Sequence, residues 1–274
     1  MCTLIALHRC VDRAGLLIAA NRDEFYERPA SGPALRATPS GPIVAPLDLR
    51  AGGTWLGVNA QGVFAALTNR PCTAPDPTRR SRGHVVMEAL AAPTAEQAAE
   101  QLAAIPAAVH NPFNVFVADG HRAFALVYGG DRAGELRELA PGAHVVGNAD
   151  PDDRTNPKVA RVLARAEAAA GLGADAALEA LADACREQGC GSPHGALGDT
   201  CVHTDGYGTR SSLLLRLARD GERASEEPFG GDDRLLFADG APCTTSYLDF
   251  TPLLRELTQR ARYARGRDHG RKAQ

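Results

Sequence analysis

Long apolar runs and an excess of charge of one sign are both missing from this chain of 274 residues. No run approaches the roughly 18 consecutive apolar residues of a membrane-spanning helix, so we expect no integral membrane segment. The formal net charge is −3, from 30 basic and 33 acidic residues. The chain therefore lacks the basic character of nucleic-acid-binding proteins. Because 44% of its residues are hydrophobic, it can form a sizeable core.

Closely spaced cysteine pairs and metal-binding histidine patterns are also missing. The cysteines include no Cys-x-x-Cys pair, and their number is odd; they stand at positions 2, 10, 72, 185, 190, 201 and 243. We therefore expect reduced thiols and no metal site. Residues 1–4 lack the features of a signal peptide, so the sequence predicts a cytoplasmic protein. Lysine occurs only at Lys158 and Lys272, a usage typical of GC-rich genomes.

Hydrophobic patterning predicts strands, two helices, strands, two helices and strands along the chain. This order favours an α+β layered protein over a parallel βαβ repeat. A Pro/Gly-rich loop is expected from Arg28 to Pro42, and an acidic surface loop from Gly221 to Asp233. Thr94 and Asn156 are the expected N-caps of two of the helices. The expected strands span 2–8, 15–21, 52–59, 63–68, 113–118, 123–128, 144–147, 209–217, 234–238 and 244–250, and the helices 84–90, 94–105, 156–166 and 174–187.

The C-terminal segment differs in charge from the rest of the chain. Residues 255–274 carry seven basic residues against two acidic ones. We predict one domain over residues 1–254 and a basic tail over 255–274, in which a solvated helix end accounts for the charge.

Cys2 is the first candidate for chemistry. Removal of the initiator methionine would leave a free α-amine, with a pKa of about 8, on the residue that also carries the thiol. Such an amine acts as the general base for its own side chain. Alternatively, a cysteine here is a small apolar residue on a buried strand.

The second candidate is the cluster Asn21-Arg22-Asp23-Glu24, at the end of the strand expected to pair with the N-terminal one. By the two-residue period of a strand, Asn21 and Asp23 share one face, and Arg22 and Glu24 the other. A hairpin would bring Asp23 within reach of the Cys2 α-amine. Alternatively, the four residues form a solvated turn.

Three more polar residues follow or begin predicted strands. Asn69 and Asn148 carry amides that can donate to an oxyanion, and removal of one such donor costs about 3–4 kcal/mol of transition-state stabilisation. Arg210 can hold a thiolate or a substrate carboxylate. Each is alternatively a turn residue.

Together these residues resemble the NRDE-motif family, also called the transport and Golgi organisation family. The resemblance runs from Cys2 to about Phe250 and rests on Asn21-Arg22-Asp23-Glu24, Gly52-Gly53-Thr54-Trp55-Leu56-Gly57, Leu67-Thr68-Asn69 and Ser81-Arg82-Gly83. It implies the fold of the N-terminal nucleophile hydrolases, a four-layer α-β-β-α sandwich of two antiparallel sheets.

Similarity to cysteine amidases of the choloylglycine hydrolase and penicillin V acylase kind implies roles for these residues. By this similarity Cys2 matches the nucleophile and Asp23 the carboxylate that orients the α-amine. Asn69 and Asn148 match the oxyanion and substrate-orienting amides, and Arg210 the arginine of a late strand. We assign Asn21, Arg22 and Trp55 to substrate binding, although Trp55, beside two glycines, also suits the core.

One position departs from the amidase pattern. Those enzymes place an arginine three residues before the orienting aspartate, and here that residue is Ala20. Arg22 is expected to face the opposite side of the strand from Asp23, which leaves Arg210 as the charge that stabilises the Cys2 thiolate.

Two hypotheses of function follow. The first is a cysteine amidohydrolase that cleaves a linear N-acyl amide and uses no cofactor. The second is a non-enzymatic protein on the same scaffold that binds haem, or an acyl-CoA or lipid-like ligand, although the chain has no Cys-x-x-Cys-His and no Cys-Pro motif for haem. Removal of Met1 is required by the first hypothesis and not by the second.

Overall fold

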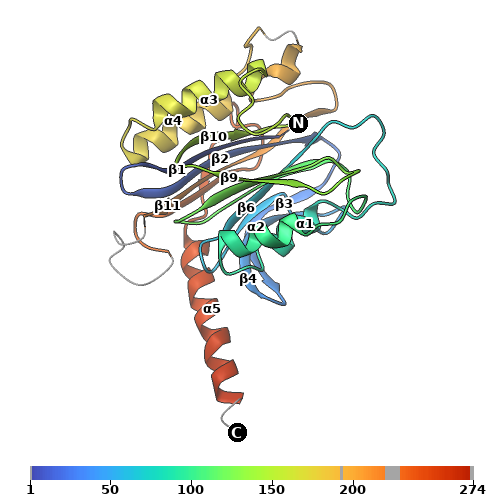
Figure 1. The fold of residues 1–274 in the computed structure, drawn as a ribbon. Coiled ribbons are helices and arrows are strands. Elements are labelled where there is room, and N and C mark those ends of the chain that lie inside the picture. Colours follow the sequence, from blue (N-terminus) through green and yellow to red (C-terminus); the bar gives the residue numbers. More distant parts are fainter. Residues whose placement is uncertain (1, 192–193, 220–228, 272–274) are drawn as a thin grey trace.

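The computed structural model describes residues 2–191, 194–219 and 229–271, with side chains up to residue 263. In this part of the chain the strands form two antiparallel sheets that pack face to face, and a pair of helices covers the outer face of each (Figure 1). The predicted four-layer α-β-β-α sandwich is therefore confirmed.

The first sheet contains the N-terminal strand. Its strands lie in the order β10 (Gly142–Val146), β1 (Thr3–Val11), β2 (Ala14–Phe25), β11 (Tyr207–Ala218), β12 (Arg234–Ala238) and β13 (Leu248–Asp249). Its outer face is covered by α3 (Pro157–Ala169) and α4 (Ala174–Arg186). The predicted hairpin of β1 and β2 is confirmed, with Thr3 opposite Asn21.

The second sheet follows the chain in order. It consists of β3 (Ala30–Thr38), β4 (Gly41–Asp48), β5 (Leu56–Asn59), β6 (Phe64–Asn69), β7 (Phe113–Ala118), β8 (Ala123–Tyr128) and β9 (Glu135–Leu139). The helices α1 (Gly83–Ala89) and α2 (Ala95–Ala103) cover its outer face.

The expected loop from Arg28 to Pro42 is wrong, because this segment contributes β3 and the start of β4. Its prolines suggested a loop, since proline cannot donate a ladder hydrogen bond. Here Pro33 lies on an edge strand at a register shift between Ser31 and Ala34, where that donor is not needed. The acidic loop expected from residue 221 falls largely on residues 220–228, outside the described part of the chain.

The predicted caps are confirmed. The Thr94 hydroxyl accepts a hydrogen bond of 3.2 Å from the Gln97 N–H at the start of α2. The Asn156 side chain accepts from the N–H groups of Lys158 and Val159 at the start of α3, with Pro157 at the first helical position. Asn156 therefore fixes where α3 begins and, with it, the place of Lys158.

Strand alternation sets the direction of the side chains at the end of β2. Leu4, Ile18 and Ala20 pack in the core between the sheets, whereas Ile5 and Ala19 pack against α3 and α4. By the same alternation Arg22 is directed between the sheets, and Asn21 and Asp23 toward the helices. The end of β2 thus supplies charged groups to both sides of one sheet.

The C-terminal helix α5 (Pro252–Arg271) packs on the inner core through Leu254 and Leu257 and then extends from the body of the molecule (Figure 1). The helix α5 spans the predicted boundary between the domain, residues 1–254, and the basic tail, residues 255–274. This domain boundary stays a prediction. None of the helices in the described residues is long and apolar enough to cross a membrane.

Candidate functional site

Cys2 lies immediately before β1, where two cavities meet. One cavity, of about 460 Å³, is lined by arginines and is called the arginine cavity below. The other, of about 290 Å³, includes Lys158 and is called the Lys158 cavity. The half-buried Cys2 side chain lines both, and its Sγ is 3.9 Å from the backbone oxygen of Asp23. A nucleophile at this position is reached from either cavity.

Burial governs the acidity of the Cys2 thiol. It raises the pKa of Cys2, and the carboxyl of Asp23 acts in the same direction, while the positive charge of Arg22 lowers it. Since the thiolate is the reactive form of cysteine, the positive groups around Cys2 decide its reactivity.

Asp23 supplies a buried carboxyl group beside Cys2, and the residue is only 3% exposed. The Thr209 hydroxyl donates a hydrogen bond of 2.7 Å to its Oδ1, and the Tyr207 hydroxyl donates one of 3.0 Å to its backbone oxygen. Burial raises the pKa of Asp23 to about 6, while Lys158 and the hydrogen bond from Thr209 act to lower it.

Lys158 is a charged residue of this site to which the sequence analysis gave no role. Its Nζ is buried, and no hydrogen-bond partner for it is found among the described residues. Burial lowers the pKa of Lys158, and the negative charge that opposes this most strongly is that of Asp23. The rarity of lysine was the available signal: in a chain that otherwise uses arginine, a lysine at position 158 indicates a position with a specific role.

Asn21 and Arg22 have different surroundings. The Asn21 amide donates to the backbone oxygens of Cys185 and Thr200, at 2.9 and 3.0 Å, so it ties β2 to the segments beyond α4. Neither cavity is lined by Asn21. Arg22 lines the arginine cavity together with Cys2 and Trp55. Its guanidinium lies over the Trp55 ring, 4.5 Å from the ring centre.

The expectation that Arg210 alone supplies the positive charge beside the Cys2 thiolate is therefore wrong. Arg22 does point away from the side of Asp23, but Cys2 lies on the same side as Arg22. In the antiparallel ladder Thr3 pairs with Asn21, and the next position beyond this pair places Cys2, which precedes Thr3, opposite Arg22, which follows Asn21. Arg22 is a positive charge near the thiol, even though Ala20 occupies the position of the amidase arginine.

The two candidate oxyanion donors meet at the ends of β6 and β10. The Asn148 amide donates to the backbone oxygen of Asn69 at 2.5 Å. Asn69 lines the arginine cavity and Asn148 the Lys158 cavity, so the pair spans the region around Cys2. Asn114, which the sequence analysis did not single out, donates to the backbone oxygens of Gly147 and Ala149 and joins these strand ends.

Arg210 is not brought to Cys2 by the fold. It falls at a register shift between Thr209 and Ser211, lies over the Tyr26 ring at 6.0 Å, and lines neither cavity. The charge that sequence reasoning gave to Arg210 is supplied near Cys2 by Arg22 and Lys158.

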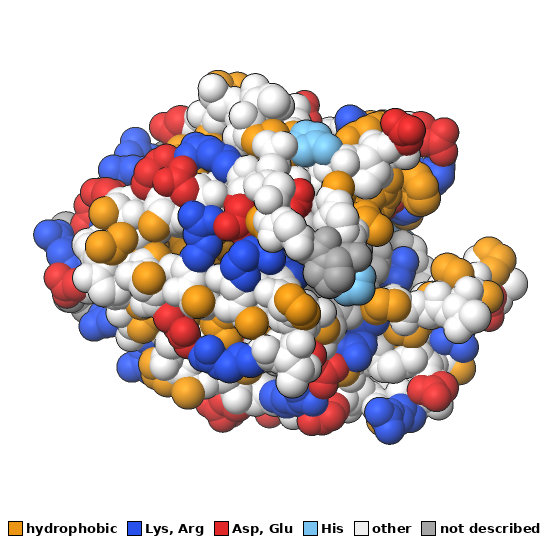
Figure 2. Space-filling view, turned by 90° about the horizontal axis from the view of Figure 1, so that it is seen from above, with side chains coloured by type: hydrophobic (Ala, Val, Ile, Leu, Met, Phe, Trp, Pro, Cys, Tyr) orange, Lys and Arg blue, Asp and Glu red, His pale blue; other side chains and the backbone are white. Residues whose placement is uncertain are grey.

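The arginine cavity concentrates positive charge. Seen from above, the molecular surface mixes basic and acidic side chains (Figure 2). Arginine outnumbers acidic residues in the cavity itself, however; the arginines are Arg22, Arg28, Arg50, Arg79, Arg80 and Arg82, and the acidic residues are Asp23, Glu24, Asp48 and Asp76. This lining favours an anionic ligand.

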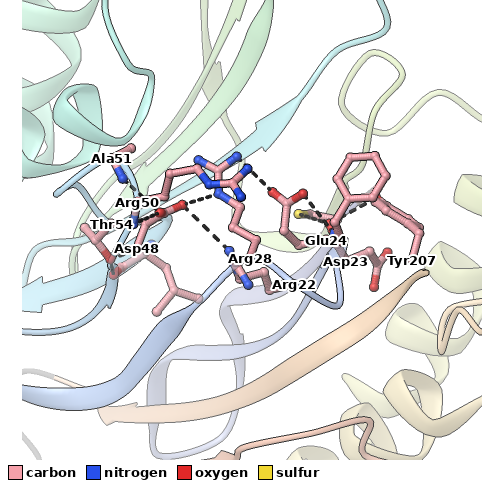
Figure 3. A network of polar contacts seen from close by, with 12 residues as sticks. Arg22, Asp23, Glu24, Arg28, Asp48, Arg50, Ala51, Thr54 and Tyr207 are labelled. Atoms are coloured by element: carbon pink, nitrogen blue, oxygen red, sulfur yellow. Dashed lines mark hydrogen bonds and ion pairs between the residues drawn. The ribbon is translucent and has the colours of Figure 1, made fainter.

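Asp48 organises part of this lining, as Figure 3 shows. Its Oδ2 lies 2.7 Å from Arg28 Nε and 3.7 Å from Arg22 Nη2, while its Oδ1 accepts from the backbone N–H groups of Arg50 and Ala51. Two of the six arginines, Arg50 and Arg82, have no carboxylate partner among the described residues. The Arg82 Nη1 atom donates to the Pro112 backbone oxygen at 3.2 Å, and the rest of its guanidinium and that of Arg50 are available to a ligand.

A close glycine contact brings two of the sequence motifs together. A Cβ added at Gly53 would lie 2.6 Å from the carbonyl carbon of Gly83, so only glycine fits there. The Thr54 N–H donates to the Gly83 backbone oxygen at 3.3 Å. The segment that contains Trp55 is thereby held against the one that contains Arg82, and both line the arginine cavity.

Solved structures with this fold include two variants of the conjugated bile acid hydrolase from Clostridium perfringens. One is 10% identical with a TM-score of 0.53 and covers 91% of this chain and 93% of its own. The other is 10% identical with a TM-score of 0.51 and covers 91% and 96%. At this identity the similarity concerns the fold, which is that of the N-terminal nucleophile hydrolases.

Curated relatives share more of the sequence. The human Transport and Golgi organization protein 2 homolog is 28% identical over an alignment of 230 residues, and the match covers 75% of this chain and 83% of the relative. The homolog from Bos taurus is 33% identical over an alignment of 141 residues, and the match covers 49% of this chain and 50% of the relative. The family model described as Transport and Golgi organisation 2 matches residues 1–227. The chain therefore belongs to the Transport and Golgi organisation 2 family.

Proposed function

We propose that this protein is an amidohydrolase that cleaves a linear N-acyl amide with Cys2 as its N-terminal nucleophile. The observation that carries the proposal is the place of the Cys2 sulfur, at the junction of two cavities and 3.9 Å from the backbone oxygen of Asp23, the residue whose buried carboxyl acts on the thiol. The proposal requires removal of Met1, which converts the Cys2 backbone nitrogen into an α-amine.

The proposed reaction has two halves. The Cys2 sulfur attacks the amide carbonyl carbon, and its proton passes to the α-amine and then to the leaving nitrogen as the C–N bond breaks. Water then attacks the resulting thioester, which releases the acid and restores the thiol. Asp23 orients the α-amine, and the side-chain amides of Asn69 and Asn148 donate to the oxyanion.

The two cavities support a substrate with two unlike parts. The Lys158 cavity is lined by Pro71, Val145, Val159 and Leu197, which suit an apolar group. The arginine cavity suits an anionic group. The proposed substrate is therefore an amide with an apolar part and an anionic part on opposite sides of the scissile bond.

The test begins with the intact mass of the purified protein, because a retained Met1 would exclude this mechanism. Fluorogenic N-acyl amides that carry a carboxylate are then assayed, and a thiol-reactive acyl probe is used to locate the acylated residue. Cys2→Ser is expected to abolish both turnover and labelling. Cys10→Ser is the matched control and should retain both, whereas unchanged labelling of Cys2→Ser would assign the reactive thiol elsewhere.

A binding protein on the same scaffold is the second candidate. Burial raises the pKa of the Cys2 thiol, which favours an unreactive cysteine, and the cavities would hold an amphipathic anion such as an acyl-CoA without cleaving it. For haem, the cavity-lining residues of a ligating type in the described chain are Cys2 and His194. Titration of the purified protein with haem or an acyl-CoA, with or without Met1, tests this candidate. The absence of both a Soret shift and saturable binding would exclude it.

A further inference from the structure

Two cysteines and a histidine converge outside the two cavities. Cys201 and His203 lie just before β11, and Cys243 follows β12, some 40 residues later in the sequence. The Sγ atoms of Cys201 and Cys243 are 3.3 Å apart, and both thiols are free. The Nε2 atom of His203 lies 3.6 Å from the first sulfur and 3.1 Å from the second.

We propose that these three residues form a zinc site. In tetrahedral Zn²⁺ coordination, with Zn–S of about 2.3 Å and Zn–N of about 2.0–2.1 Å, neighbouring ligand atoms lie about 3.5–3.8 Å apart. The Cys201–Cys243 and His203–Cys243 distances are shorter than this by a few tenths of an ångström, and the Cys201–His203 distance of 3.6 Å lies within the range, so small movements of the side chains admit the ion. A single imidazole nitrogen faces both sulfurs, which is the arrangement that one shared ion requires.

The donor set selects the class of metal. Two thiolates and one imidazole suit zinc, while hard cations such as Mg²⁺ and Ca²⁺ prefer oxygen ligands. Binding of Zn²⁺ releases the two thiol protons to solvent and changes no oxidation state, so it needs no other reactant. The fourth coordination position is left for water. Sequence analysis missed this set because Cys201-x-His203 is a short spacing and Cys243 comes from another strand connection.

Thr209 connects the proposed zinc site to Asp23 by hydrogen bonds. Val202, between the two ligands, donates its N–H to the Thr209 hydroxyl at 2.8 Å and accepts from the Thr209 N–H at 2.8 Å. The same hydroxyl donates to Asp23 Oδ1. A metal that holds Cys201 and His203 therefore also holds the backbone that positions Thr209 and, through it, the carboxyl of Asp23.

The experiment uses the full chain, purified under reducing conditions. We expect one Zn²⁺ per chain by elemental analysis. Replacement of zinc by Co²⁺ should give thiolate-to-cobalt charge-transfer absorption and the visible bands of tetrahedral cobalt. His203→Ala is the main variant, because His203 is exposed and its loss spares the core. It should weaken Co²⁺ binding at least about 10- to 100-fold, the loss seen when even an outer partner of a metal ligand is removed.

Cys243→Ser should remove most of the charge-transfer band, and Cys10→Ser, the matched control, should leave it intact. Absence of bound zinc together with no cobalt–thiolate absorption would overturn the proposal. So would a Cys201–Cys243 disulfide in the protein as purified, or equal Co²⁺ affinity in His203→Ala and the unaltered chain. None of these readouts depends on amidohydrolase activity.

Discussion

Thr209 donates a hydrogen bond of 2.7 Å to the buried carboxyl of Asp23 across the β2–β11 ladder. Thr209→Val keeps the shape of the side chain and removes this donor. We expect the free energy of unfolding at pH 8 to fall by about 1–3 kcal/mol, because an ionised buried carboxylate then loses its partner. Urea denaturation measures this change.

The control for this prediction is Thr209→Ser, which keeps the hydroxyl and should lose much less. At pH 5 most Asp23 carboxyls are protonated, so the loss in Thr209→Val should be smaller there. An equal loss at both pH values would assign the effect to packing and to the acceptor that the Val202 N–H loses, and not to the hydrogen bond with Asp23.

The sequence was sufficient for the layers and for the neighbourhood of Cys2 and Asp23. The two-residue period of β2 predicted which residues share a face, because successive side chains of a strand point alternately to the core between the sheets and to the covering helices. The caps at Thr94 and Asn156 were predicted for a similar reason, because they depend on residues within one helical turn.

The remaining parts of the site depend on contacts between distant segments. Lys158 reaches Asp23 only because α3 packs across the outer face of the first sheet, which no local pattern encodes. Arg210 was assigned to the site from its position in a late strand, but the register shift beside it changes the direction of its side chain. A one-residue shift in a strand moves a side chain to the other face.

The raised pKa of Asp23 predicts a characteristic pH dependence of stability. The pKa of this carboxyl is about 6 in the folded protein against an ordinary value of 3.8, so the folded state binds more protons between these values. Its contribution to stability is present below about pH 4 and is lost as the pH rises through 6, by about 3 kcal/mol. Asp23→Asn should remove this decline.

Urea denaturation of the unaltered chain and of Asp23→Asn, at several pH values from about 4 to 8, gives the difference. The exposed Asp12 provides the matched control, and Asp12→Asn should leave the pH profile unchanged. Parallel profiles of the unaltered chain and Asp23→Asn would show that Asp23 titrates normally.

Lys158 is predicted to keep the Cys2 thiol reactive. Lys158→Met removes a positive charge near the sulfur while it keeps most of the side-chain volume. We expect alkylation of Cys2 by iodoacetamide at pH 8 to slow about tenfold, which corresponds to a rise of about one unit in the thiol pKa. Mass spectrometry of the Cys2 peptide measures the rate.

Lys158→Arg retains the charge and should alkylate at nearly the original rate. Lys272→Met removes the other lysine, which lies outside the described residues, and Cys10 serves as an internal reference thiol in every sample. If Lys158→Met and Lys272→Met alkylate equally fast, Lys158 has no electrostatic role at Cys2.

Trp55 makes the arginine cavity observable, because it is the single tryptophan of the chain and lies against Arg22. An anion that binds in the cavity should change the position or intensity of Trp55 fluorescence. Pyrophosphate is a suitable probe, since guanidinium groups bind phosphate oxygens in pairs. Arg82→Gln should raise its Kd by about 10- to 100-fold, the equivalent of one charge-assisted hydrogen bond of about 1.5–3 kcal/mol.

Arg255→Gln removes a guanidinium from the exposed surface of α5 and is the matched control for overall charge. It should leave the Kd unchanged, while added salt should weaken pyrophosphate binding in all three proteins. If Arg82→Gln and Arg255→Gln have the same effect, the fluorescence change reports general electrostatic attraction and the cavity has no specific anion site. A selective effect of Arg82→Gln instead places the anion next to Gly83 and Trp55, on one side of Cys2, and this position fixes which side of the scissile bond carries the charge.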